Sequence, residues 1–293
     1  MRWPGFQSSL SLLAVLLALV GCSSLIFAPR DSAVGNAHPG LDGQRSLERL
    51  PVAGVLNSST GCALHYRLYR PAVTGSAAQA SIRVILGHGF LRSQQRMAGL
   101  AETIAAAGIP VATLDFCNMR FWDGGHLQNG LDMIALARHL DGVQPVIYVG
   151  FSAGALAALV AARNDPHALG VVTLDLVDTQ GIGERAARDL DKPLIGLAGE
   201  PGACNAKDNA RAVFAASSRA RLMRIEDAGH CDFEAPTDAL CELVCADPDQ
   251  ADASRTAQLR ASIRHQTLAA ILTLIPPSAI GPSPRTASAA TRG

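Results

Sequence analysis

Short apolar runs alternate with longer helical stretches through most of the chain. The expected strands are Leu64–Tyr69, Ile82–Leu86, Pro110–Leu114, Val146–Val149, Val171–Leu176, Leu194–Ala198 and Arg221–Ile225. The expected helices are Met97–Ala107, Leu127–Leu140, Ala153–Arg163 and Ala257–Leu274. Buried runs that alternate with helices predict an α/β fold with a doubly wound, mostly parallel sheet. In such a sheet, functional side chains gather beyond the carboxyl ends of the strands.

The two ends of the chain depart from this alternation. Residues 22–50 are rich in small and polar residues, which predicts a tether. Residues 276–293 are rich in Pro, Ser, Ala, Thr and Arg, which predicts a disordered tail. One folded domain is therefore expected over residues 51–275, and a chain of 293 residues is long enough to bury one sizeable core.

The N-terminus carries a positive residue, Arg2, ahead of an apolar run over Leu10–Val20. Such a short run is typical of an export signal rather than of a membrane-spanning helix. The residues that end it, Leu19-Val20-Gly21-Cys22, resemble a bacterial lipobox, in which the cysteine thiol accepts lipid. Residues 1–21 are thus an expected signal peptide, and Cys22 is the expected lipidation site; an ordinary signal peptide with a chance cysteine is the alternative.

The residue after the lipobox bears on where the chain is anchored. Ser23 resembles the sorting pattern of outer-membrane lipoproteins rather than the Asp that retains them in an inner membrane. Several acyl chains give stable attachment without any spanning helix. We therefore expect an exported lipoprotein on the outer membrane of a Gram-negative bacterium, on its periplasmic or surface face.

Export would place the remaining cysteines in an oxidising compartment, where disulfides persist. Six cysteines remain after Cys22, namely Cys62, Cys117, Cys204, Cys231, Cys241 and Cys245. Their connectivity does not follow from the sequence; we favour a Cys204–Cys231 bridge, because these two residues flank the candidate acid and base loops. Zinc at Cys241 and Cys245 with the neighbouring His230-Cys231 pair is the less favoured alternative, because no paired C-x-x-C occurs.

Charge and aromatic content narrow the class of partner. Lys and Arg together number 25, as do Asp and Glu, so the formal net charge is zero. Nucleic-acid-binding domains usually carry a basic excess, so no nucleic-acid partner is expected. Aromatic residues make up 4% of the chain, which disfavours stacking platforms for bases.

The strongest candidate nucleophile lies on a strand-to-helix turn. Gly150-Phe151-Ser152-Ala153-Gly154 matches the pattern G-x-S-x-G, directly after the expected strand Val146–Val149 and at the start of an Ala-rich helix. The turn is too tight for side chains at the flanking positions, which accounts for the two glycines. The helix N-terminus behind Ser152 favours developing negative charge. We therefore expect Ser152 to be the nucleophile.

A second glycine-containing turn offers a candidate oxyanion hole. His88-Gly89-Phe90 follows the expected strand Ile82–Leu86. An oxyanion hole in this context takes one backbone N–H from that loop and one from the residue after the nucleophile. The expected donors are therefore Phe90 and Ala153.

His230 is the expected general base. It lies in Asp227-Ala228-Gly229-His230, just past the last expected strand. A loop position allows the histidine ring to face the serine, and the chain order Ser, acid, His matches that of the G-x-S-x-G hydrolases.

Two carboxylates compete for the role of the acid. Asp175 ends the strand Val171–Leu176, where side-chain alternation allows only one of Asp175 and Leu176 to face the site. Glu200 lies on a Gly/Pro-rich loop after the next strand. We favour Asp175, with Glu200 as the alternative and Asp178 as a third candidate.

Over residues 60–275 the chain resembles the chlorophyllase and cutinase/lipase branches of the α/β-hydrolase superfamily. The resemblance rests on His88-Gly89-Phe90, on Gly150–Gly154 and on Leu174-Asp175-Leu176-Val177-Asp178. Chlorophyllases and pancreatic-type lipases carry the acid soon after the elbow, where Asp175 matches their Asp although Leu176 replaces their Pro. Cutinase-like polyester hydrolases place it after the next strand, which points to Glu200.

The motifs and the resemblance together predict a serine hydrolase that cleaves carboxylic esters through an acyl-enzyme, with no cofactor or metal. The expected partners are an ester substrate and the lipid bilayer, with no obligate protein partner. An amidase or peptidase on the same fold and a non-catalytic ligand-binding lipoprotein are the alternatives.

The segment between Leu176 and Leu194 is too short for a large helical lid. An open cleft that accepts bulky or polymeric esters is therefore expected. The loop Asn118–Gln128 is an alternative cover for the site.

Overall fold

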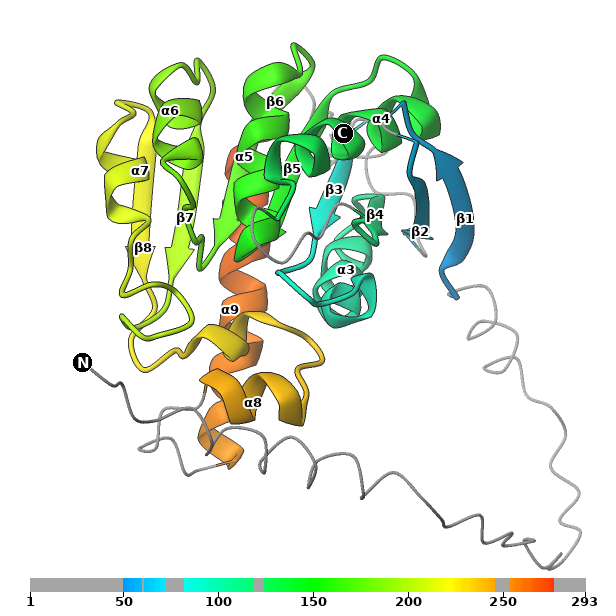
Figure 1. Cartoon of the computed structure of the whole chain (residues 1–293). Helices are drawn as coiled ribbons and strands as arrows, with labels where there is room; N and C mark the ends of the chain where they lie inside the picture. Colours follow the sequence, from blue (N-terminus) through cyan, green and yellow to red (C-terminus); the bar gives the residue numbers. More distant parts are fainter. Residues whose placement is uncertain (1–49, 60, 72–81, 118–123, 246–252, 277–293) are drawn as a thin grey trace, which may run out of the picture. The chain divides into compact units, whose positions relative to one another are not determined.

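The computed structural model of the chain describes residues 50–59, 61–71, 82–117, 124–245 and 253–276. Within these ranges eight strands form one sheet, in the order β1-β2-β4-β3-β5-β6-β7-β8 (Figure 1). The strands are β1 (Val52–Asn57), β2 (Ala63–Tyr69), β3 (Arg83–Gly87), β4 (Val111–Leu114), β5 (Val146–Phe151), β6 (Ala168–Leu174), β7 (Leu194–Ala198) and β8 (Ala220–Arg224). Strand β2 runs antiparallel to both β1 and β4, and all other neighbouring pairs are parallel. The predicted doubly wound, mostly parallel sheet is confirmed.

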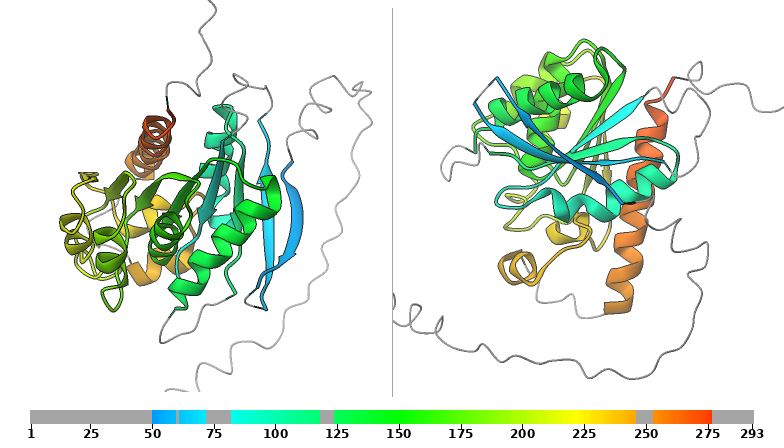
Figure 2. Two further views of the ribbon diagram at one scale, coloured as in Figure 1. Left: turned by 90° about the horizontal axis from the view of Figure 1, so that it is seen from above. Right: turned by 90° about the vertical axis from the view of Figure 1, so that its right-hand side faces the viewer.

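Helices cover both faces of this sheet (Figure 2). In the described residues they are η2 (Gln94–Met97), α3 (Ala98–Ala106), α4 (His126–Asp141), α5 (Ala153–Asn164), α6 (Ile182–Arg188), α7 (Arg211–Ala215), η3 (His230–Phe233), α8 (Ala239–Cys245) and α9 (Ala253–Thr273), where η denotes a 3₁₀ helix. Helices α4 to α7 contribute to one apolar core, and α3 and α9 contribute to the core on the opposite face.

The centre of the sheet is buried on both faces. Every residue of β4 and of β5 is buried. Helix α5 packs against this region with an unbroken buried run from Gly154 to Ala162, most of it alanine. Small side chains allow a helix backbone to approach a sheet closely, so α5 and β5 hold the turn between them at a fixed position.

Each strand and helix expected from the sequence is present, but several short elements were not predicted. Strand β1 was missed because it is an edge strand with no buried position. Strand β6 ends at Leu174 rather than at Leu176, because Asp175 adopts a φ of 43° and leaves the extended conformation. The short helices α6, α7 and α8 were also missed, since none spans more than seven residues.

Several expectations fall on other parts of the chain. The expected signal peptide, Cys22, the tether up to residue 49 and the tail from residue 277 lie outside the described residues. Residues 118–123 of the loop proposed as a cover for the site lie outside them too. Among the helices of the described ranges, none is long and apolar enough to cross a membrane.

Candidate active site

The expected site residues meet beyond the carboxyl ends of β5, β6 and β8. Ser152 directly follows β5 and Asp175 directly follows β6, whereas His230 begins η3 after β8. Backbone hydrogen bonds extend the sheet past the strand ends: Ser152 N–H donates to the Leu174 carbonyl (2.9 Å), and Asp175 N–H donates to the Leu197 carbonyl (2.7 Å). The sheet itself therefore sets the positions of the serine and the aspartate.

The turn at Ser152 has the strained geometry expected of a nucleophile elbow. Ser152 adopts φ 54° and ψ −119°, a conformation that non-glycine residues rarely adopt. A Cβ atom at Gly150 would overlap the Gly154 backbone, and one at Gly154 would overlap the carbonyl oxygen of His88. Both glycines are therefore required by close backbone contacts.

A continuous chain of hydrogen bonds joins the three predicted residues. The Nε2 atom of His230 lies 3.0 Å from Ser152 Oγ, and its Nδ1 atom lies 2.6 Å from Asp175 Oδ2. An ionised carboxylate only accepts hydrogen bonds, so Nδ1 carries the proton and Nε2 is left to accept from the serine hydroxyl. The ring of Phe151 packs against the His230 ring, with 4.7 Å between centroids.

Asp175 is held by donors other than the histidine. Its Oδ1 atom accepts the backbone N–H of Gly199 (2.9 Å), and the side-chain amide of Asn205 lies 3.3 Å from both carboxylate oxygens. The same amide nitrogen donates to the Glu200 carbonyl (2.7 Å). Asn205 was not predicted, because an asparagine on a loop next to a cysteine carries no sequence signal for this contact.

The two other candidate acids have different roles. The side chain of Glu200 is exposed, and its backbone N–H donates to the Ala228 carbonyl (2.7 Å). Asp178 accepts the backbone N–H of Gly183 (2.6 Å) at the start of α6. Among the three candidates, Asp175 is the carboxylate that the structure places against His230.

The loop after β3 packs directly against the serine turn. A Cβ atom at Gly89 would lie 3.3 Å from the Cβ of Ser152. His88 fixes this loop, because its Nδ1 bonds to the Gly89 carbonyl (2.7 Å) and its Nε2 accepts the backbone N–H of Phe116 (3.1 Å). Burial lowers the pKa of His88, so this ring is neutral. Phe90 follows in the loop, and Ala153 begins α5 behind the serine.

A pocket of about 320 Å³ opens beside Ser152 and His230. One side is the loop after β3, including Phe90 and Leu91, and another is α8 with Leu240 and Val244. Helix α8 lies beyond the carboxyl ends of the strands (Figure 1). No large lid domain was expected, and the connection between β6 and β7 holds only the short α6; α8, which follows the candidate base, lines the pocket instead.

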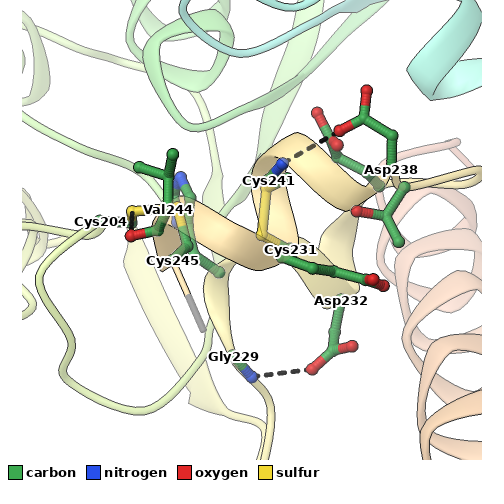
Figure 3. The surroundings of a disulfide bond; sticks show 12 residues. Cys204, Gly229, Cys231, Asp232, Asp238, Cys241, Val244 and Cys245 are labelled. Atoms are coloured by element: carbon green, nitrogen blue, oxygen red, sulfur yellow. Dashed lines mark hydrogen bonds between the residues drawn. A yellow bond between two sulfur atoms is a disulfide. The ribbon is translucent and has the colours of Figure 1, made fainter. Parts of the chain in front are cut away.

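Three disulfides occur in the described residues, and their pairing corrects the sequence-based preference for Cys204–Cys231. Cys62 pairs with Cys117, Cys204 with Cys245 and Cys231 with Cys241 (Figure 3 for the last two). The proposed bridge is wrong because Cys204 and Cys231 each bond to a cysteine of α8. The zinc alternative loses its ligands as well, since the sulfurs of Cys241 and Cys245 are engaged in separate disulfides.

Ion pairs join the loop after β3 to the segment that follows His230. Arg92 binds the fully buried carboxylate of Glu234 through two contacts of 2.7 Å and also reaches Asp238 at 2.8 Å. The hydrogen bond to Glu234 raises the pKa of Arg92. Asp238 accepts the backbone N–H of Cys241 in α8, and this bond, with Arg92, lowers the pKa of Asp238.

Comparisons with known proteins identify the fold. No protein-family model and no curated protein matches the sequence. Solved structures do match, including Est1E from Butyrivibrio proteoclasticus (TM-score 0.51, 17% identity, 74% of this chain and 99% of that chain). A ferulic acid esterase from Streptomyces cinnamoneus matches with a TM-score of 0.54 at 17% identity, over 80% of this chain and 92% of that one.

A third match is a predicted CIB-like hydrolase from Thermoplasma acidophilum, with a TM-score of 0.51 and 14% identity over 72% of this chain and 98% of that one. At these identities the likeness concerns the fold. The sheet order, the serine turn between β5 and α5, and these matches lead to one conclusion: this chain has the α/β-hydrolase fold.

Proposed function

We propose that the protein is a serine hydrolase that cleaves carboxylic esters, with Ser152, His230 and Asp175 as its catalytic residues. The observation that carries this proposal is the hydrogen-bonded chain from Ser152 Oγ through His230 to Asp175, with distances of 3.0 and 2.6 Å. Esterases among the structures of the same fold, such as Est1E and the ferulic acid esterase, add support.

In the proposed first step, Ser152 Oγ attacks the ester carbonyl carbon while His230 Nε2 accepts the hydroxyl proton. The carbonyl oxygen of the ester then carries negative charge, which the backbone N–H groups of Phe90 and Ala153 stabilise. Asp175 holds the His230 ring in the required tautomer and stabilises the imidazolium that forms.

The tetrahedral intermediate collapses when His230 returns its proton to the leaving alcohol, and an acyl-enzyme on Ser152 remains. A water molecule then attacks the acyl carbon while His230 again accepts a proton. Collapse of this second intermediate releases the carboxylic acid and restores the serine hydroxyl. Every proton moves through His230 Nε2, so the reaction needs no metal or cofactor.

A fluorophosphonate probe and nitrophenyl esters test this proposal. The wild-type protein should form a covalent adduct at Ser152 and hydrolyse the esters, whereas Ser152→Ala should do neither. Loss of a catalytic triad member lowers the rate by about 10⁴-fold or more. The assignment fails if Ser152→Ala, folded by circular dichroism, keeps a tenth of the wild-type rate. Labelling without ester hydrolysis, but with cleavage of nitroanilides, would identify an amidase instead.

We further propose that the protein is exported and anchored to a membrane through lipid on Cys22. The lipobox-like residues Leu19 to Cys22 support this proposal. The disulfides agree with an oxidising compartment, which export would provide. Replacing Cys22 by Ser should move the protein from the membrane fraction to the soluble fraction. A variant that still pellets with membranes after a high-salt wash would contradict the anchor.

A further inference from the structure

Helix α8 is joined to the rest of the protein in an unusual way. All seven of its residues are described, and Cys241 alone is buried. Leu240, Leu243 and Val244 are 59, 82 and 66% exposed, so apolar packing contributes little to holding the helix in place.

Cross-links hold α8 instead. Cys241 is bonded to Cys231, the residue after His230, and Cys245 is bonded to Cys204 on the loop after β7 (Figure 3). Asp238, just before the helix, accepts the N–H of Cys241 at 3.0 Å and pairs with Arg92 at 2.8 Å. The two disulfides thus tie the helix to the base loop and to the loop that carries Asn205.

The same helix borders the pocket beside the nucleophile. Leu240 and Val244 line this pocket together with Ser152 and His230, whereas Leu243 does not. Leu240 and Val244 lie four residues apart, and such residues lie on one face of a helix. Phe90 and Leu91 line the same pocket. The space next to the reacting oxygen is therefore largely apolar, and α8 supplies two of the three aliphatic side chains that line it, Leu91 being the third.

We propose that α8 is a disulfide-fixed wall of the substrate pocket, and that Leu240 and Val244 select esters with an extended apolar acyl group. This inference rests on the proposed ester hydrolysis and specifies its substrate class. We expect a short acyl group such as acetyl to stop short of these two side chains and a medium-length chain to contact both. The disulfides matter for selectivity because the exposed helix has no buried face to keep it at the pocket.

The first experiment compares p-nitrophenyl octanoate with p-nitrophenyl acetate, and acetate serves as the internal reference. The measured quantity is the octanoate-to-acetate ratio of kcat/KM. The double variant Leu240→Ala with Val244→Ala should lower this ratio by about tenfold or more, because each lost methylene contact in an apolar pocket weakens discrimination. Leu243→Ala is the matched control on the same helix, and its ratio should stay within about twofold of wild type.

The second experiment removes one cross-link. Replacing Cys204 and Cys245 together by Ser should lower the same ratio by about fivefold or more, because the wall is no longer fixed at its C-terminal end. Replacing Cys62 and Cys117 together is the control, since that disulfide does not line the pocket. Its loss should lower the melting temperature without changing the ratio.

Specific outcomes would overturn the inference. An unchanged ratio in the Leu240/Val244 double variant, or an equal fall in Leu243→Ala, would remove α8 from substrate selection. Equal losses on both esters in the Cys204/Cys245 variant would mean that the disulfide acts through Asn205 and Asp175 rather than through the wall. A wild-type protein that hydrolyses neither ester overturns the proposed function itself, whereas an active wild type with an unaffected double variant overturns only the wall.

Discussion

The two sides of the site are built by different means. On one side, Ser152 and Asp175 sit on backbone that continues buried strands, with α5 packed behind them. On the other side, the segment from His230 to Cys245 is held by disulfides and ion pairs. The contrast shows that the core fixes the nucleophile and the acid, whereas disulfides and ion pairs hold the pocket wall and add to the core packing of Phe233 in the base loop.

The largest expected effect concerns the side that the sheet builds. Asp175→Asn should lower kcat by about 10⁴-fold near neutral pH, because an amide at this position stabilises the wrong tautomer of His230. Glu200→Gln is the matched control, and its activity should stay within about tenfold of wild type. Steady-state hydrolysis of a nitrophenyl ester measures both. If Glu200→Gln lost its esterase activity while Asp175→Asn kept it, the assignment of the acid would be reversed.

A smaller effect is expected on the cross-linked side. Glu234→Gln should lower the free energy of unfolding by about 3 kcal/mol, because it leaves the Arg92 charge without its buried partner. The remaining contact of Arg92 with Asp238 keeps the loss near the lower end of the usual range. Urea denaturation followed by circular dichroism measures the change.

The control for this variant is Glu184→Gln. The Glu184–Arg188 pair spans one helical turn, and its side chains are 42 and 60% exposed. Exposed pairs of this kind contribute little, so a change within about 0.5 kcal/mol is expected. If both variants lowered the free energy of unfolding equally, the Arg92–Glu234 pair would not be what joins the loop after β3 to the segment after His230.

The smallest expected effect concerns His88, in the loop after β3, which contacts both sides of the site. Burial lowers the pKa of His88 below its ordinary value of 6.5 and outweighs the hydrogen bond to Gly89 and the charge of Asp115, both of which raise this pKa. Above pH 6.5 the ring is neutral in the folded and unfolded states. Below it the unfolded chain binds a proton that the folded protein does not, so stability falls as the pH falls, by at most about 1.4 kcal/mol per pH unit.

Unfolding free energies at pH 5 and pH 7 test this dependence. The difference between the two values should shrink in His88→Gln. The exposed His65 offers a control, and His65→Gln should retain the wild-type difference. An unaltered difference in His88→Gln would mean that other groups cause the acid sensitivity.

The sequence predicted the strands from β3 to β7 because each is a short, largely buried apolar run, and it predicted the serine turn because a tight turn requires particular residues. Asp175 was preferred to Glu200 because it ends a strand close after the serine turn, and the structure has it directly after β6. The added argument from side-chain alternation does not apply, because Asp175 has already left the strand with φ 43°. The contact of Asn205 and the pairing of the cysteines depend on loops that meet only in three dimensions. Helix α8 was missed because its seven residues are too few to show a helical period in the sequence.

The exposure of α8 has a consequence for how this protein can be altered. Leu240 and Val244 bury little surface, so replacing them removes little of the apolar contribution to folding. The helix is anchored by other residues, namely the disulfides of Cys241 and Cys245 and the ion pair of Glu242 with Arg260. A library that varies positions 240, 243 and 244 while keeping Cys241 and Cys245 should therefore change the range of substrates with little effect on the stability of the fold.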